Sequence, residues 1–389
     1  MKKEVLKIFF KPLSMLNKLI PKQENLIFFY SNLGFRDNVK AMFDYLISHD
    51  YQKQYQIVCA INEEEKYLRL QKENQELYQN VSFVSCKKGI PSFLRCKVGF
   101  YCFGKYPIKP AKTQTIINLW HGVPMKKIGN MEEQFQKVDY NFFTYLLTTS
   151  EFYAPIMQQS FSCGPEQILI EGQPRNDALF FPLTKKECAW KEQWEKVIVW
   201  LPTYRNTESL QDEQKDAWPV PVLDLQQAER LNAYLEQKNC HLVIKLHPLQ
   251  FGENLKQFRQ IEVWTQAMLE EHFDSLYQLL KLADGLLTDY SSVYFDYMLL
   301  DRPIGFTIDD IEKYSSSRGF VFENPKDFMP GRMIDTEEDM KLFIDEVIQG
   351  TDSFAQERRK VNDLVNRYKD GKSSERIAKR YIQNHESLS

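Results

Sequence analysis

The stretch GLLTDYSSVYFDYMLLDRP, residues 285–303, changes character within a few residues and so indicates the fold. It opens with a short apolar run that stops at Thr288 and Asp289, as a buried strand does at its end. Ser291 or Ser292 then stands where a helix N-cap is expected, and apolar residues continue at helical spacing. A strand followed at once by a helix is the unit from which parallel α/β sheets are built.

The same alternation recurs along the chain, because short apolar runs are separated by stretches with helical spacing. The segment 172–187 interrupts the pattern with Gly and Pro, and we expect a hinge near 175–190. Two similar α/β halves with parallel sheets and a cleft between them are therefore predicted, and ligands in such sheets bind at the carboxyl ends of the strands. The apolar runs are 26–30, 56–61, 81–84, 98–102, 115–119, 145–149 and 168–172 in the first half, and 197–203, 241–248, 285–290 and 303–306 in the second.

Length and composition bound the class of protein. A chain of 389 residues is too long for one ordinary core, and its 43% hydrophobic and 26% charged residues are typical of a globular protein. The net charge of −3 gives no support for a nucleic-acid partner. Seven scattered cysteines without a CxxC spacing indicate reduced thiols. No His, Asp or Glu cluster has zinc spacing, so we expect no metal and no cofactor.

The first 22 residues, MKKEVLKIFFKPLSMLNKLIPK, carry six lysines against one glutamate. Apolar residues between Leu6 and Ile20 fall near one face of a helix. This pattern is typical of a helix on an anionic membrane surface, and also of a helix packed on its own domain. Pro12 weakens the helix in both interpretations. Lysines interrupt the apolar run, which argues against a signal peptide, and no stretch approaches the roughly 20 apolar residues that span a bilayer.

Polar residues follow the buried strands at their ends. In TIINLWHGVPMKK, His121 can titrate near neutral pH, Gly122 allows close approach of the backbone, and Lys126 and Lys127 can neutralise phosphate. A solvated turn beside a core histidine is the alternative. The Trp-His-Gly cluster at a strand end favours the functional interpretation.

Two more strand ends carry candidate residues. In VIKLHPL, Pro248 stops the strand and leaves His247 at its end. In WLPTYR, Thr203 and Arg205 follow the strand, and a guanidinium suits bidentate contact with phosphate. An ordinary surface arginine is the alternative for this motif.

The helix start at residues 291–292 predicts an anion site, since the first backbone N–H groups of a helix and two serine hydroxyls converge there. Simple capping without a ligand is the alternative. No GxxxxGK[ST], GxGxxG or GxSxG motif is present in the required context. P-loop, kinase, ordinary dehydrogenase and hydrolase functions therefore lose their main support.

Taken together, WHGVPMKKIG, GQPRND, LPTYR, KLHP and TDYSSVYFDYMLLDRPI…DIEKY…RGF resemble the CDP-glycerol glycerophosphotransferase family, in order, over about residues 26–345. The resemblance implies a GT-B-like α/β fold, in which two Rossmann-like domains with parallel sheets face a central cleft. It divides the chain into a basic segment 1–22, an acceptor-side domain 23–180 and a CDP-alditol-binding domain 181–389. It also implies transfer of an alditol phosphate from CDP-glycerol or CDP-ribitol to a hydroxyl, with release of CMP.

The resemblance also implies roles for the candidate residues. By this resemblance, His121 would act as the general base on the acceptor hydroxyl, and His247 would contact the pyrophosphate. Gly122, Lys126 and Lys127 lie on the acceptor or phosphate side. The donor and phosphate contacts would come from Arg205, Thr288, Asp289, Ser291 and Ser292, with Asp289 either conformational or in contact with the sugar.

The implied acceptor is a polyprenyl-diphosphate-linked saccharide or polymer of teichoic acid or capsule synthesis. The implied location is peripheral, at the cytoplasmic face of the cell membrane. Val123 stands where the family often has threonine, and Gly305 and Thr307 also depart from its pattern, which leaves glycerol and ribitol both open. A GT-B glycosyltransferase using a nucleotide sugar is the alternative enzyme, and a non-catalytic polymer- or nucleotide-binding protein is the alternative from another class.

Overall fold

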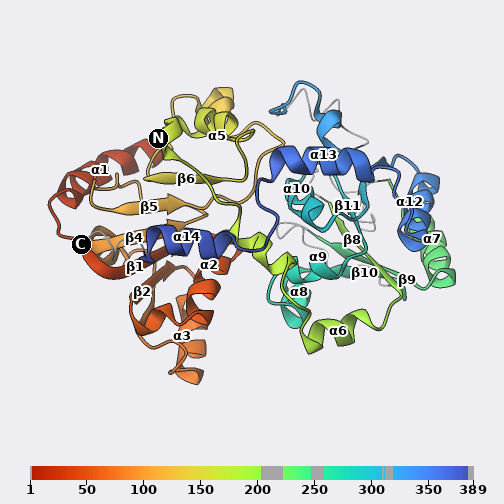
Figure 1. The fold of residues 1–389 in the computed structure, drawn as a ribbon, viewed down its shortest axis with the longest axis horizontal. Helices are drawn as coiled ribbons and strands as arrows, with labels where there is room; N and C mark the ends of the chain where they lie inside the picture. The colour runs from red at the N-terminus through yellow and green to blue at the C-terminus, as the bar shows by residue number, and fades with distance from the viewer. Residues whose placement is uncertain (1, 203–221, 247–257, 309–310, 312–318, 384–389) are drawn as a thin grey trace. The chain divides into compact units, whose positions relative to one another are not determined.

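The computed structural model describes residues 2–202, 222–246, 258–308, 311 and 319–383. The chain forms two compact units. Unit 1 consists of the described residues within 1–123, 128–177 and 367–389, and unit 2 of those within 124–127 and 178–366. Each unit is an α/β domain built on one parallel sheet (Figure 1). The predicted class, α/β with two parallel sheets, is confirmed.

The sheet of unit 1 has seven strands in the order β3-β2-β1-β4-β5-β6-β7, and neighbouring strands pair in parallel. The strands are β1 (Gln23–Ser31), β2 (Gln56–Ile61), β3 (Val81–Val84), β4 (Cys96–Tyr101), β5 (Thr115–Asn118), β6 (Tyr145–Thr148) and β7 (Ile168–Ile170). The helices are α1 (Lys2–Asn17), α2 (Asp37–Ser48), α3 (Glu64–Glu73), α4 (Ile90–Arg95), α5 (Ala154–Phe161) and α14 (Ser373–Tyr381).

Both faces of this sheet are covered, which explains why β1 reads as a continuous apolar run. Ile27 and Phe29 of β1 pack into a cluster with α2, α3 and α14, whereas Phe28 and Tyr30 pack into a cluster with α4 and α5. Figure 1 shows α14 alongside α2, although more than 300 residues of sequence separate them. The C-terminal helix therefore completes the core of unit 1.

The sheet of unit 2 has six parallel strands in the order β10-β9-β8-β11-β12-β13. They are β8 (Lys196–Leu201), β9 (Cys240–Lys245), β10 (Ile261–Trp264), β11 (Gly285–Thr288), β12 (Ile304–Phe306) and β13 (Arg332–Met333). The helices are α6 (Lys185–Lys191), α7 (Leu225–Gln237), α8 (Gln266–His272), α9 (Leu276–Leu282), α10 (Val293–Tyr297), α12 (Glu337–Gln349) and α13 (Ala355–Val365). Helices α7 and α12 cover one face through a shared apolar cluster.

Short 3₁₀ turns complete the described elements of both units. They are η1 (Tyr51–Lys53), η2 (Gly129–Met131), η3 (Glu133–Phe135), η4 (Pro165–Gln167), η5 (Pro174–Leu179), η6 (Met298–Leu300) and η7 (Pro325–Phe328).

Residues 354–383 contain two helices that belong to different units. Helix α13 ends at Val365 and α14 begins at Ser373, and Gly371 between them has a φ of +66°. A positive φ is readily available to glycine and ends helical geometry. The division by contacts thus puts 367–389 with unit 1, whereas the division from sequence had kept 181–389 in one domain.

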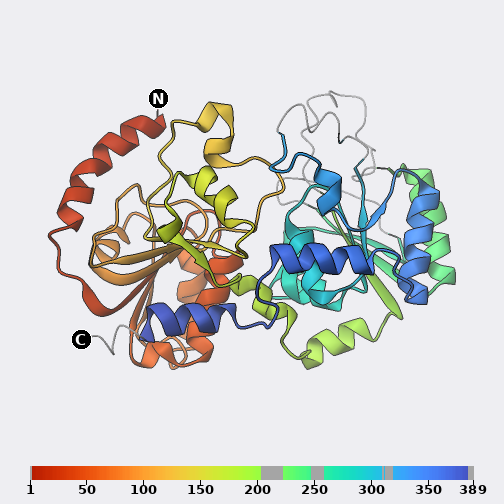
Figure 2. The same cartoon turned by 45° about the horizontal axis from the view of Figure 1, so that its top comes forward.

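Helix α1 lies along one side of unit 1, as Figure 2 shows in red. Phe10 and Leu13 pack against the cluster under α4 and α5, and the Asn17 side chain is buried and bonded to Gln114. Met15 and Leu19 are exposed by 67% and 80%. Among the described residues, no helix is both long enough and apolar enough to cross a membrane.

Candidate active site

The strand order of each sheet marks a place where ligands bind in α/β proteins. In unit 1 the winding reverses between β1 and β4, and in unit 2 it reverses between β8 and β11. Ligands collect outside the carboxyl ends of the strands at such a switch point. The candidate residues follow strands that stand at a switch point, as β11 does, or one strand away from it, as β5 does.

The chain leaves β5 in unit 1 through a strained turn. Trp120 has a φ of +48°, which is unfavourable for a side chain of this size, and Gly122 has a φ of +116°. The Asn118 side-chain oxygen accepts a hydrogen bond from the Trp120 backbone N–H at 3.0 Å, which supports the turn. The two positive φ values turn the backbone sharply around His121. Strain of this kind is typical of functional sites.

The His121 imidazole lies between two aromatic rings. Its centroid is 3.9 Å from the Trp120 ring and 5.1 Å from the Phe103 ring, with interplanar angles of 31° and 20°. Burial lowers the pKa of His121 to about 4, while the Asp37 carboxylate raises it and the Arg175 guanidinium lowers it further. The residue as a whole is only half-buried. It therefore presents a neutral imidazole at pH 7 that can accept a proton.

Side chains from distant segments hold this turn. The Asn38 amide nitrogen, at the start of α2, donates to the carbonyls of Leu119 and Trp120 at 3.1 and 3.0 Å. The Arg175 guanidinium donates to the His121 carbonyl at 2.9 Å and to both oxygens of Asp37 at 2.9 and 2.8 Å. These residues were not among the predicted site residues. Asn38 and Arg175 lie 82 and 54 residues from their bonding partners Trp120 and His121, so no local pattern reveals the contacts.

Two residues of the GQPRND motif, Arg175 and Asp177, contact different parts of unit 1. Arg175 holds the His121 turn, whereas Asp177 accepts hydrogen bonds from the backbone N–H groups of Ser373 and Ser374 at 2.8 Å each. Asp177 thus binds the N-terminus of α14 within unit 1. Burial raises its pKa, and the four hydrogen-bond contributions from the two serines oppose that rise. The motif combines support of the site with support of the core.

Lys126 and Lys127 belong to unit 2, although they follow His121 closely in sequence. Lys127 donates its backbone N–H to the Gly319 carbonyl at 3.2 Å, and Val321 donates to the Met125 carbonyl at 3.0 Å. An antiparallel bridge joins Lys126 to Phe320. The lysines are thus held by the backbone of residues 319–321, with Lys126 half-buried and Lys127 exposed.

In unit 2, Thr288 is the last residue of β11, beside β8, and Asp289 follows it. Thr288 is buried, and its hydroxyl donates to the carbonyl of Leu201 at the end of β8, at 3.0 Å. The Asp289 carboxylate is also buried and accepts a hydrogen bond from the Ser291 backbone N–H at 3.2 Å. Both side chains therefore shape the strand end. This geometry makes Thr288 a support for neighbouring groups.

Ser291 and Ser292 follow at the start of α10, and both are half-buried. Ser292 occupies the N-cap position, but its hydroxyl forms no capping bond because its backbone is already helical, with φ −65° and ψ −8°. The expected N-cap residue is thus present without the expected capping bond. Helix α10 covers only five residues, followed by the 3₁₀ turn η6.

The remaining predicted residues fall into two groups. His247, Thr203 and Arg205 lie outside the described residues. Gly305 lies in β12, where an added Cβ would come within 2.7 Å of Ile334 and Leu287, so close packing explains the glycine. The Thr307 hydroxyl donates to the Thr288 carbonyl at 3.2 Å.

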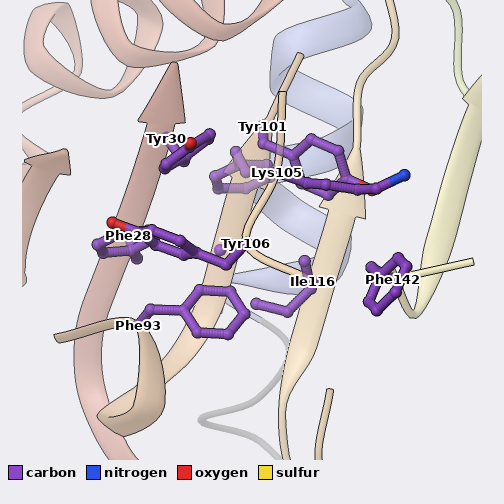
Figure 3. A pocket seen from close by; sticks show the side chains of 10 residues that line it. Phe28, Tyr30, Phe93, Tyr101, Lys105, Tyr106, Ile116 and Phe142 are labelled. Carbon is purple, nitrogen blue, oxygen red and sulfur yellow. The ribbon is translucent and has the colours of Figure 1, made fainter. Parts of the chain in front are cut away.

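A small hollow of about 10 Å³, partly open to solvent, lies beside the sheet of unit 1 (Figure 3). Its lining includes Phe28 and Tyr30 of β1, Tyr101 of β4, and Lys105 and Phe142 from loops. Most of these side chains belong to the buried aromatic core, and His121 is not among the lining residues. The hollow is therefore an irregularity of core packing separate from the His121 turn.

The chain belongs to the CDP-Glycerol:Poly(glycerophosphate) glycerophosphotransferase family, whose model matches residues 13–383. It is accordingly a CDP-glycerol glycerophosphotransferase family enzyme, as the sequence motifs had indicated. The predicted family is confirmed.

Two curated relatives illustrate the range of the family. The chain is 28% identical to a teichoic acid poly(glycerol phosphate) polymerase of Bacillus spizizenii over 358 residues, covering 82% of this chain and 83% of the relative. It is 30% identical to the teichoic acid glycerol-phosphate primase of Bacillus subtilis over 289 residues, covering 70% and 69%.

Solved structures show the same fold. A variant of the wall teichoic acid polymerase TagF soaked with CDPG superimposes with a TM-score of 0.76 at 20% identity, covering 100% of this chain and 97% of that chain. A UDP-N-acetylglucosamine 2-epimerase homologue from Listeria monocytogenes gives 0.55 at 10% identity, covering 94% and 98%. The GT-B-like architecture predicted from the sequence is thus confirmed.

Proposed function

We propose that this protein transfers glycerol phosphate or ribitol phosphate from a CDP-alditol to a hydroxyl of a lipid-linked teichoic acid or capsular polymer precursor. The family match over residues 13–383 carries this proposal. Relatives named as polymerases and primases of glycerol phosphate, and as a primase of ribitol phosphate, support the donor class.

In the proposed reaction the acceptor hydroxyl attacks the β-phosphorus of the CDP-alditol. A phosphodiester bond forms, the bond from that phosphorus to the bridging oxygen breaks, and CMP leaves with the electron pair. The hydroxyl proton passes to the neutral imidazole of His121. An alcohol is a weak nucleophile at neutral pH, and a positioned general base contributes about 10²–10⁴-fold to the rate of such a step.

Unit 2 would bind the donor phosphates. The half-buried hydroxyls of Ser291 and Ser292 supply donors, with Thr288 and Asp289 supporting the strand end beneath them. Lys126 and Lys127 add positive charge on the same unit. Preorganised donors of this kind stabilise the charge that develops on the leaving CMP. His247 and Arg205 keep the roles that their motifs predict, contact with the pyrophosphate and additional charge.

A CMP-release assay tests the reaction. The purified full chain is incubated with a lipid-linked acceptor and either CDP-glycerol or CDP-ribitol. CMP formed together with a new phosphodiester supports the proposal and identifies the alditol. Nucleoside diphosphate and a glycoside formed from a nucleotide sugar, with no CMP from either CDP-alditol, would instead establish the glycosyltransferase alternative.

We further propose a peripheral location at the cytoplasmic face of the membrane, through α1. The exposed Met15 and Leu16 of α1, and the exposed Leu19 just after it, stand beside exposed lysines, as in helices that lie on anionic lipid. Deleting residues 1–22 is a poor test because Asn17 is buried against unit 1 and Lys22 donates to the Leu94 carbonyl.

Changing the three exposed residues to serine avoids this problem. The triple variant should bind vesicles containing phosphatidylglycerol at least ~10-fold more weakly, because several apolar side chains no longer enter the interface. Turnover of a soluble acceptor analogue should be unchanged. The matched control replaces Leu68 and Leu77, exposed apolar residues elsewhere in unit 1, by serine. Equal vesicle binding by the triple variant and the wild type would remove α1 as the contact.

A further inference from the structure

The contacts around His121 point to a support whose parts lie far apart in the sequence. Arg175 and Asp37 form an ion pair in which the side chains are exposed by only 7% and 19%. A single guanidinium nitrogen, Nη1, contacts both Asp37 oxygens and the His121 carbonyl at 2.8–2.9 Å. Charge-assisted hydrogen bonds that are largely shielded from water hold geometry firmly.

Asn38 is the second part of the support and is completely buried. Its amide nitrogen donates to the carbonyls of Leu119 and Trp120 and to the side-chain oxygen of Gln173 at 3.0 Å, and its own oxygen accepts from the Arg175 backbone N–H at 3.0 Å. The same side chain thus links the His121 turn to the segment that carries Arg175.

Three consecutive carbonyls, those of residues 119, 120 and 121, are therefore held by side chains. The Trp120 carbonyl also accepts from the Cys102 thiol at 2.7 Å. A φ of +48° is unfavourable for a residue of this size, and such a conformation persists only where its surroundings enforce it. The held carbonyls are the enforcing contacts.

We propose that Asp37, Asn38 and Arg175 are positioning residues for the reaction: they hold the backbone of residues 119–121 so that the His121 imidazole keeps a productive place. The proposal rests on the proposed role of His121 as the base. It assigns to GQPRND, and to the first turn of α2, a function that none of the sequence motifs had revealed.

The charge of this support and its geometry can be separated by mutation. Lysine at position 175 keeps the positive charge, but its side chain ends one bond short of the Nη1 position, so the contact with the His121 carbonyl lengthens. Glutamine removes the charge. Arg175→Gln should raise the His121 pKa and Asp37→Asn should lower it, because Arg175 lowers and Asp37 raises that pKa in the native protein.

Unit 1 contains a matched control. Arg376 repeats the pattern of Arg175: its Nη1 contacts both oxygens of Asp370 at 2.9 and 2.7 Å, and its Nη2 donates to the Glu171 carbonyl at 2.9 Å. It lies on α14, and among the described residues its hydrogen bonds go to Glu171, Asp370 and Ser373 and not to the His121 turn. Arg175→Lys and Arg376→Lys thus make the same chemical change in a pair of similar sites.

The experiment measures CMP release and, separately, the titration of the His121 imidazole by NMR in the full-length protein. Arg175→Lys should lower kcat ~10- to 100-fold with the donor KM nearly unchanged, because a displacement of about 1 Å in a catalytic group has effects of this size. Arg376→Lys should keep the wild-type kcat. In the NMR titration, Arg175→Gln and Asp37→Asn should move the His121 midpoint in opposite directions, and Asn38→Ala should lower kcat with little change in that midpoint.

Equal kcat values for Arg175→Lys and Arg376→Lys would overturn the proposal, as would a His121 titration that neither charge variant moves. The NMR readout needs no turnover. A failure of the positioning inference is therefore distinguishable from a failure of the proposed function. If the proposed function fails, His121→Ala retains the wild-type rate, while the His121 titration still responds to substitution of Arg175.

Discussion

Two imidazoles in this molecule share their electrostatics but differ in their place in the sheet. His121 in unit 1 and His241 in unit 2 both stack on tryptophans, with centroids 3.9 Å from Trp120 and from Trp194 respectively. Burial lowers the pKa of each to about 4. His121 follows the carboxyl end of β5 in the sheet of unit 1. His241 lies near the amino end of β9 in the sheet of unit 2.

This comparison shows that a perturbed pKa does not identify an active site by itself. His241 is completely buried, and the structure gives neither of its ring nitrogens a hydrogen-bond partner among the described residues. Within the described part of the chain, its Nε2 lies 3.7 Å from the Glu262 carboxylate, beyond hydrogen-bond distance. Perturbed values cluster at functional sites, but buried structural groups show them as well. The position at a strand's carboxyl end is what separates the two histidines.

The largest expected effect comes from the same substitution at both positions. His121→Phe keeps the ring stacking but removes the proton acceptor, and we expect kcat to fall about 10²–10⁴-fold. His241→Phe should leave kcat near the wild-type value. Both are measured by CMP release with purified, folded protein.

His121→Ala serves as a second variant, because it removes the acceptor without adding volume at the site. If His241→Phe reduced the rate as strongly as the two His121 variants, the position at a strand's carboxyl end would not separate the catalytic histidine from the buried one.

The next effect concerns stability and should appear at His241. Its pKa is about 4 in the folded protein and about 6.5 unfolded, so between these values the unfolded chain binds the extra proton. The free energy of unfolding should therefore fall as the pH falls through this window, by up to ~3 kcal/mol at pH 4 from this group. His241→Phe should remove this part of the dependence and leave stability above pH 7 nearly unchanged.

Urea titrations at pH 7 and at pH 4.5, followed by circular dichroism, measure this change. An equal acid-induced loss of stability in the wild type and in His241→Phe contradicts the assignment of a buried, neutral His241.

The smallest effect probes the rings beside the histidines. Phe103→Leu removes one stacking partner of His121, so water should reach the imidazole and its pKa should rise toward the ordinary value of 6.5. The activity of the variant should then begin to fall at a higher pH on acidification than that of the wild type. Trp194→Leu, the matched change beside His241, should lower stability without moving the pH dependence of kcat/KM. A pH–rate profile that shifts for Trp194→Leu and not for Phe103→Leu would reverse the interpretation.

Most of the fold was predictable because parallel strands covered on both faces consist of continuous apolar residues, as in VIVWLPT and GLLTDY. Strands β10 and β13 were missed. Strand β10 is the four-residue IEVW at one edge of the sheet, and β13 has only two residues at the other edge. Short edge strands carry little apolar signal.

Part of the candidate site was predictable for a similar reason. His121 stands out because a polar residue directly follows a buried strand. Asp37 and Asn38 did not stand out, because an Asp-Asn pair at the start of a helix is an ordinary capping sequence. Arg175 belongs to a motif used for the family resemblance, yet its contact with His121 depends on tertiary structure.

The segment 124–127 affects how this enzyme can be recombined with its relatives. Because it pairs with residues 319–321 and its Met125 sulfur accepts a hydrogen bond from the Tyr294 hydroxyl at 3.2 Å, unit 2 is not a continuous stretch of gene. Consider a chimera that takes residues 178–366 from this protein and the rest from a relative. Its segment 124–127 would come from the relative and would have to pair with residues 319–321 of this protein. An exchange of unit 2 between family members therefore needs two separate inserts, one of them only four codons long.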